Sequence, residues 1–163
     1  MFQKSVMQNY LKNLDQERVA EAYTIFQSYF GDKARIKNIK LLKEESYQEG
    51  FLREFFVQVL GYTINPDTNY NLTTEYKNQT DSKKADGAIL QNGSAIGVIE
   101  LKSTKTKNLE SIKNQAFSYK NNQPDCVYVI TSNFRKIRLY IDHAIEFVEW
   151  DLFDISEDNF KVL

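Results

Sequence analysis

Residues 84–102 constrain the fold of this chain more than any other segment. Two runs of apolar, strand-forming residues, at 84–90 and 95–102, flank the dipeptide Asn92-Gly93. Asparagine and glycine both accept positive φ, so this dipeptide between strand-like runs is a strong signal for a hairpin turn. The segment therefore predicts an antiparallel β-hairpin.

The remaining segments alternate between helical and strand periodicity. Apolar residues at helical spacing predict helices over residues 5–30, with a break near Asp15, over 46–60 and over 108–119. Runs rich in β-branched and aromatic residues predict further strands over residues 72–76, 126–130, 137–141 and 145–150. This order of elements predicts an α/β (α+β) sandwich with a crossover helix after the third strand.

Length and composition favour one folded domain. The 163 residues are 42% hydrophobic and 26% charged, which excludes the disordered and low-complexity classes. We interpret residues 1–163 as a single domain, with an N-terminal helical part over about 1–40 and a core over about 45–150. One cysteine and one histidine leave no internal disulfide and no zinc cluster, so a reducing, cytoplasmic setting fits best. No window approaches the roughly 20 apolar residues of a membrane span.

Two acids and a lysine interrupt the apolar strands of the predicted hairpin. Asp86 lies in the first strand, and Glu100 and Lys102 lie in the second, two residues apart and on one face. Buried carboxylates are costly unless they are paired or bind a cation, and oxygen ligands favour Mg²⁺. A structural ion pair with Lys84 or Lys102 is the alternative explanation.

A shared site requires a particular strand register. With a two-residue loop, Asp86 opposes Ile99 and points away from Glu100, because side chains alternate faces. A three-residue loop with a bulge places Asp86 opposite Val98, on the face of Glu100. We therefore predict a loop of odd length or an equivalent bulge, with positive φ at Gly93.

Asp86, Glu100 and Lys102 resemble the catalytic signature of the PD-(D/E)XK nuclease superfamily. Gln115 and Tyr119, on the helix that follows, resemble the Gln-x-x-x-Tyr motif of the nuclease domains of Type I and Type IIG restriction enzymes. Residues 49–62 resemble the first core helix of those domains, and the similarity spans about residues 45–141. The resemblance implies that Asp86 and Glu100 bind Mg²⁺, that Lys102 positions the attacking water, and that Gln115 and Tyr119 orient the DNA backbone or the lysine.

The helix acid of this family has two candidates here. The resemblance implies that Glu49 lies near the metal as a further catalytic residue. However, residues 46–49 also read as a capping box, in which Glu49 bonds the backbone amide of Ser46. Glu45, one turn earlier on the same face, is the other candidate.

A second Asp and Glu-x-Lys pattern occurs upstream, at Asp67, Glu75 and Lys77. Its neighbours are mostly polar, so these charges are expected to be solvated and to need no metal. We therefore assign the site to Asp86, Glu100 and Lys102.

The resemblance implies a restriction-endonuclease-like core, a mixed β-sheet flanked by helices, that hydrolyses phosphodiester bonds of double-stranded DNA with Mg²⁺, or with Mn²⁺ in its place. It also implies a fragment of a larger restriction-modification protein, with methyltransferase and target-recognition domains outside this chain. A catalytically inactive nuclease-fold module for DNA binding or assembly is the alternative. The net charge of −1 requires a local DNA-binding face. Its candidates are Lys105, Lys107, Lys113, Arg135, Lys136 and Arg138.

Overall fold

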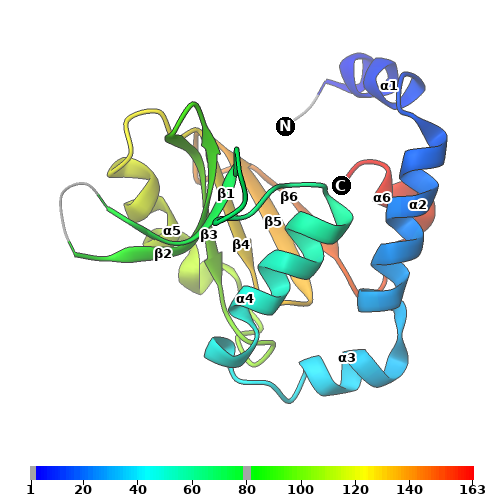
Figure 1. The fold of residues 1–163 in the computed structure, drawn as a ribbon, viewed down its shortest axis with the longest axis horizontal. Helices are drawn as coiled ribbons and strands as arrows, with labels where there is room; N and C mark the ends of the chain where they lie inside the picture. Colours follow the sequence, from blue (N-terminus) through cyan, green and yellow to red (C-terminus); the bar gives the residue numbers. More distant parts are fainter. Residues whose placement is uncertain (1–2, 79–81) are drawn as a thin grey trace.

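The computed structural model describes residues 3–78 and 82–163 and has a mixed α/β fold (Figure 1). Its sheet has six strands in the order β1-β2-β3-β4-β5-β6. The strands are β1 (Leu72–Lys77), β2 (Lys84–Gln91), β3 (Ser94–Leu101), β4 (Tyr128–Ser132), β5 (Lys136–Ile141) and β6 (Phe147–Asp151). Neighbouring strands are antiparallel except β3 and β4, which are parallel and joined by helix α5. The predicted crossover helix after the third strand is confirmed.

Helices lie before the first strand, between β3 and β4, and after the last strand of the chain. They are α1 (Lys4–Lys12), α2 (Gln16–Phe26), α3 (Lys33–Ile39), α4 (Gln48–Phe51), α5 (Glu110–Asn121) and α6 (Glu157–Phe160), with π-helical segments η1 (Gln27–Gly31) and η3 (Leu52–Val59) and a 3₁₀ turn η2 (Glu44–Ser46). The predicted break near Asp15 is confirmed, because the Asp15 carboxylate accepts the backbone N–H groups of Glu17 and Arg18 and caps α2. Helices α3 and α6 were not predicted, since both are too short for a clear apolar period.

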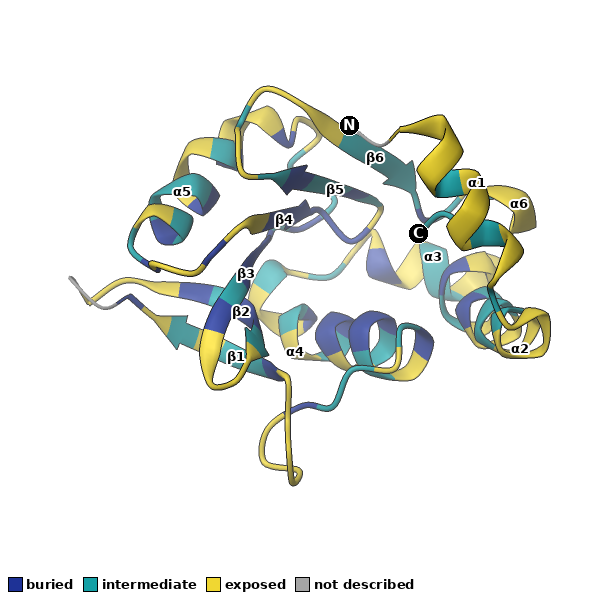
Figure 2. Ribbon diagram, turned by 90° about the horizontal axis from the view of Figure 1, so that it is seen from above, coloured by how far each residue is buried: buried dark blue, intermediate teal, exposed yellow. Residues whose placement is uncertain are grey.

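Different helices cover the two faces of the sheet (Figure 2). Helix α5 packs Ala116 and Tyr119 against Val98 and Val129 on one face. On the other face, α4 and η3 bury a cluster of aromatic rings against the sheet, as the wide apolar pattern over 46–60 predicts. Among the residues described, no helix is long and apolar enough to cross a membrane.

The turn of the β2–β3 hairpin has two residues, so the predicted odd-length loop is wrong. Asn92 and Gly93 have φ of 52° and 81°, the pattern of a type I′ turn, and the predicted positive φ at Gly93 is confirmed. The register then shifts by one residue, because Leu90 pairs with Ala95 whereas Ile89 pairs with Gly97. The equivalent bulge that we predicted therefore lies within the strands, beyond the turn.

The bulge sets the position of Asp86. Gly87 pairs with Ile99, and one residue further along this register Asp86 lies across from Glu100. The specific expectation that Asp86 opposes Val98 is wrong, since Val98 pairs with Ala88. The bulge thus brings the two acids together although the turn has even length.

Candidate active site

Asp86 and Glu100 lie beside each other on two inner strands of the sheet. The Oδ2 atom of Asp86 accepts the Leu101 backbone N–H at 2.7 Å, and its Oδ1 atom accepts the side-chain amide of Gln48 at 2.9 Å. Glu100 is 1% exposed, and its Oε2 atom has no hydrogen-bond partner among the described residues. The site therefore holds one oriented carboxylate and one buried carboxylate with an unsatisfied oxygen.

Lys102 joins three acceptors of the site. Its Nζ atom donates to Oε1 of Glu100 at 2.8 Å, to Oε1 of Glu44 at 3.0 Å and to the Leu101 carbonyl at 3.1 Å. An ammonium group has three hydrogens, so these bonds use all of its donors. Two carboxylates, those of Glu44 and Glu100, thus bind one ammonium group, and the charge of Lys102 also acts on Asp86.

The pKa values at the site follow from burial and from this excess of negative charge. The pKa of Glu100 is raised to about 7, first by burial and then by the Asp86 charge, against the lowering effect of the bond from Lys102. Burial also raises the pKa of Asp86, against the lowering effects of the Leu101 amide and of Lys102. Burial lowers the pKa of Lys102, but its bonds to Glu100 and Glu44 outweigh this effect and raise it above the usual range.

The acid that binds Lys102 is Glu44, which the sequence reasoning did not consider. Glu44 belongs to the 3₁₀ turn η2, and Gln48 follows four residues later at the start of α4. Gln48 donates to Asp86 and, at 3.5 Å, to Glu44, so it connects the two acids. The spacing of four between an acid and an amide at a helix start was the signal available in the sequence.

The two predicted helix acids have other surroundings. The carboxylate of Glu49 forms an ion pair with Arg53 at 2.9 Å, and its side chain is 66% exposed. The predicted capping box is wrong, because α4 begins at Gln48 after Tyr47 and Glu49 bonds Arg53. Glu45 is also exposed. Both Glu45 and Glu49 border the cleft beside Asp86, and Lys102 is held by Glu44.

Gln115 and Tyr119 meet one turn apart on α5, as their spacing predicts. The side-chain amide of Gln115 donates to the Tyr119 hydroxyl at 3.0 Å. Burial raises the pKa of Tyr119, the bond from Gln115 lowers it, and the charges of Glu100 and Asp86 raise it. Tyr119 therefore lies within electrostatic reach of the carboxylates, and Gln115, which is more exposed, is joined to it by this bond.

Thr131 is a buried neighbour of Glu100 that the sequence reasoning did not assign a role. The two residues are paired in the parallel β3–β4 ladder. Thr131 is 0% exposed, and its hydroxyl has no hydrogen-bond partner within the described part of the chain. Two unsatisfied polar atoms, the Thr131 hydroxyl and Oε2 of Glu100, thus occur at paired positions of neighbouring strands.

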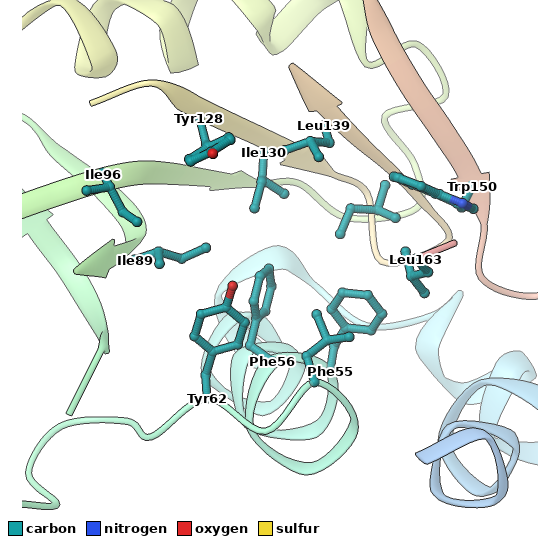
Figure 3. A pocket seen from close by; sticks show the side chains of 12 residues that line it. Phe55, Phe56, Tyr62, Ile89, Ile96, Tyr128, Ile130, Leu139, Trp150 and Leu163 are labelled. Atoms are coloured by element: carbon teal, nitrogen blue, oxygen red, sulfur yellow. The ribbon is translucent and has the colours of Figure 1, made fainter. Parts of the chain in front are cut away.

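Two cavities differ sharply in chemistry. A cleft of about 250 Å³ borders Asp86 and is rich in acids; its lining consists of Glu45, Gln48, Glu49, Leu52, Thr74, Glu75 and Asp86. A second cavity of about 220 Å³ lies between η3 and the sheet and is lined by aromatic and aliphatic side chains such as Phe56, Ile130 and Trp150 (Figure 3). None of the side chains lining this second cavity is charged, so of these two cavities only the cleft beside Asp86 offers ionisable groups.

Most of the predicted DNA-binding cations are already paired. Arg135 binds Asp151 at 2.7 Å, Lys136 and Arg138 both bind Glu149, and Lys113 binds Glu110. Lys105 and Lys107 are exposed and form no ion pair with any described residue. Of the six candidates, these two are the ones whose charge is available to a ligand.

The upstream Asp67, Glu75 and Lys77 are exposed, as their polar neighbours predict. Glu75 is bound by Lys84 at 2.9 Å, and its side chain is 73% exposed. Solvated charges of this kind need no cation. The geometry therefore leaves Asp86, Glu100 and Lys102 as the candidate site.

No protein-family model, curated protein or solved structure matches the chain. What the geometry defines is a class of site, a half-buried and a buried acid on adjacent strands with a lysine directly after the strand of the second acid.

Proposed function

We propose that this chain is a Mg²⁺-dependent DNA endonuclease domain with a restriction-endonuclease-like core. The observation that carries the proposal is the Glu100 carboxylate, which is 1% exposed, has an unsatisfied Oε2 atom and lies across from Asp86. Burying such a group costs free energy unless a ligand completes it. In a phosphodiesterase site, the ligand of this carboxylate would be a metal cation.

The charge balance supports the same proposal. Glu44 and Glu100 bind the ammonium group of Lys102 and Asp86 lies within its electrostatic reach, so three acids share one lysine and the site has an excess of negative charge in a half-buried position. Two carboxylates about 4 Å apart repel by roughly 4 kcal/mol at an effective dielectric near 20, and a divalent cation between them reverses that sign. An ion pair with Lys102 alone leaves this excess unexplained.

The residues fit a hard divalent cation. Asp86 and Glu100 offer carboxylate oxygens, the ligands that Mg²⁺ prefers. Within residues 3–78 and 82–163 no group of three His, Cys, Asp or Glu side chains forms a ready metal site, so water and phosphate oxygens would complete the shell. Such a cation supplies Lewis-acid stabilisation of the charge that grows on the phosphate.

The chain's own residues have separable roles in this proposal. Gln48 and the Leu101 amide hold Asp86 in one orientation, and Glu44 holds Lys102 beside Glu100. Lys102 positions the attacking water and stabilises the growing negative charge. Tyr119, supported by Gln115, lies where it can orient Lys102 or the DNA backbone.

One observation favours a second candidate, a nuclease-fold module that binds DNA or other subunits without cutting. All three donors of Lys102 are engaged by protein acceptors, so the lysine already neutralises part of the site. In an inactive module this internal ion pair replaces the cation. The two candidates differ in whether Mg²⁺ binds at Asp86 and Glu100.

Plasmid cleavage tests the proposal directly. The wild-type chain is incubated with supercoiled plasmid and Mg²⁺ or Mn²⁺, beside Lys102→Ala and Glu100→Gln. We expect both variants to lose at least about a hundredfold in cleavage rate, the usual loss when one transition-state donor is removed. Lys84→Ala, on β2 in a surface ion pair with Glu75, is the matched control and should cut like wild type.

A metal-dependent shift in Tm separates an inactive module from a failed assay. Wild type should melt higher in Mg²⁺, and Glu100→Gln should lose most of that shift, because a ligand stabilises only the state that binds it. A shift without cleavage would identify a cation-binding module that does not cut. Equal shifts in wild type and Glu100→Gln would refute the metal site itself.

A further inference from the structure

A cationic segment comes directly before the site. Residues 33–43 contain four lysines and one arginine and no acid, which leaves −6 for the rest of a chain whose net charge is −1. Lys33, Lys37 and Lys40 recur at spacings of four and three, so they lie on one side of α3 and its end. Lys43 follows and is adjacent to Glu44. Charge is therefore distributed very unevenly along this chain.

The packing of α3 turns these lysines to solvent. Ile39 is 3% exposed and belongs to the main core, so the apolar side of α3 faces inward. Arg35 turns towards η3 and forms an ion pair with Glu54 at 2.7 Å. The four lysines are exposed and make no ion pair with any residue in the described ranges; they are Lys33, Lys37, Lys40 and Lys43.

The end of α3 is held next to the candidate active site. The Thr104 hydroxyl donates to the Lys40 carbonyl at 3.3 Å, which joins this segment to the loop that follows Lys102. That loop carries Lys105 and Lys107. Figure 1 shows α3 beside the start of α4, where Glu44 and Gln48 lie, and shows α1 at the opposite end of the helical layer. Two segments with six exposed lysines thus meet at Lys40 and Thr104, one of them preceding Glu44 and the other following Lys102.

We infer that this lysine surface, formed by Lys33, Lys37, Lys40, Lys43, Lys105 and Lys107, binds the phosphate backbone of double-stranded DNA. The inference rests on the proposed function, since it names the surface that holds DNA against that site. The rise along the helix axis from Lys33 to Lys40 is roughly 10 Å. This is about three times the 3.4 Å by which successive phosphates of one strand advance along the duplex axis. The paired cations Arg135, Lys136 and Arg138 contribute less, because Asp151 and Glu149 already neutralise them.

Duplex DNA fits this surface better than a lipid membrane. A helix that lies on a membrane buries an apolar face in the lipid. In α3 the apolar side is already occupied by the protein core, through Ile39 and the half-buried Ile36. Leu41, which is 71% exposed, is a single apolar side chain and does not form such a face. What remains at the surface is charge, which a phosphate backbone complements.

The expected salt dependence of DNA binding follows from counterion release. If all six lysines contact phosphates, log affinity should fall with log salt at a slope of about −5. Lys37→Gln/Lys43→Gln should reduce the slope by about 2 and weaken binding about 30-fold at about 0.15 M salt, since each lost contact removes a factor of roughly 5. Lys40 is left unchanged because its ammonium lies over the Phe153 ring at 5.8 Å.

Fluorescence anisotropy with two duplexes of unrelated sequence tests the surface. The titrations are made in EDTA across a salt series, so that no cleavage occurs. We expect Lys37→Gln/Lys43→Gln and Lys105→Gln/Lys107→Gln to weaken binding to both duplexes alike, because backbone contacts carry no sequence information. Lys4→Gln/Lys12→Gln on α1, with the same change of charge, is the matched control and should bind like wild type.

Three results would overturn the inference. These are an equal loss of binding in the α1 control, unchanged binding in both test variants, and binding of wild type to vesicles of phosphatidylserine but not to the duplexes. Because binding is measured without metal, it is independent of cleavage. If wild type cuts plasmid and both test variants bind normally, the inference fails alone. If binding follows the prediction and no cutting occurs, the proposed function fails alone.

Discussion

Replacing Glu100 by glutamine should change the pH dependence of folding stability. In the folded chain burial and the Asp86 charge raise the pKa of Glu100 from 4.5 to about 7. Between these two values the folded state holds a proton that the unfolded state has released. The free energy of unfolding therefore falls as pH rises through this window, because the folded state binds more protons than the unfolded state.

The size of this effect follows from the pKa difference. At 1.36 kcal/mol for each pKa unit, the ionisation of Glu100 lowers the stability of the metal-free protein by about 3 kcal/mol between pH 4.5 and pH 8. Lys102 stays charged throughout, because its pKa is raised. Glutamine cannot ionise, so Glu100→Gln should gain about 3 kcal/mol relative to wild type over the same interval.

Urea unfolding at several pH values, followed by far-UV circular dichroism, measures the difference between the two proteins. Glu149→Gln is the control with the opposite sign. Although burial raises the pKa of Glu149, its bonds to Lys136 and Arg138 lower it overall, so its stabilising charge is present at neutral pH and lost in acid. This variant should be less stable than wild type near pH 7 and approach it as pH falls below 4.5.

Parallel curves of unfolding free energy against pH for wild type and Glu100→Gln, between pH 5 and pH 8, would refute the raised pKa of Glu100. That result would show that the Glu100 carboxylate is solvated or fully paired in the metal-free protein. In the presence of Mg²⁺ at about 100 times its dissociation constant, wild type should regain roughly 2.7 kcal/mol at pH 8. Glu100→Gln should gain much less.

Three further substitutions test the packing around the site. Thr131→Val should stabilise the metal-free protein by about 1 kcal/mol in urea unfolding, because a buried hydroxyl without a partner costs about 1–3 kcal/mol; Thr131→Ser, which keeps the hydroxyl, should not. Gly93→Ala should cost about 1–2 kcal/mol, since φ is 81° and no atom lies within 4 Å of the new Cβ; an unchanged urea midpoint would contradict the type I′ turn. Phe51→Ala should cost about 3–5 kcal/mol, because its ring is 0% exposed and packs against Phe55 and Phe134; a Tm close to that of wild type would contradict this packing.

The elements with strong local signals were predictable from the sequence. The β2–β3 hairpin follows from Asn92-Gly93 between apolar runs, and the buried helix before it follows from an apolar face over 46–60. The grouping of Asp86, Glu100 and Lys102 was also predictable, from a second local signal. Charged residues inside apolar strands are conspicuous, because burying them requires a partner.

The register of the hairpin was only partly predictable. Placing Asp86 and Glu100 together required a one-residue shift, and the shift was predicted. Its location between Ile89 and Leu90 was not, because a bulge inside regular strands has no distinctive residue here. The turn and the bulge compensate each other, and that balance is set by the packing of both strands.

Tertiary structure decided which acid completes the site and which cations remain free. Glu44, rather than Glu45 or Glu49, reaches Lys102 because α4 begins at Gln48 and a 3₁₀ turn precedes it. The β5 cations Lys136 and Arg138 are neutralised by Glu149 of β6, through cross-strand contacts that form only when the sheet assembles. Local periodicity indicates which face of an element is buried. Ion pairs depend instead on distances between elements, and only the folded chain fixes those distances.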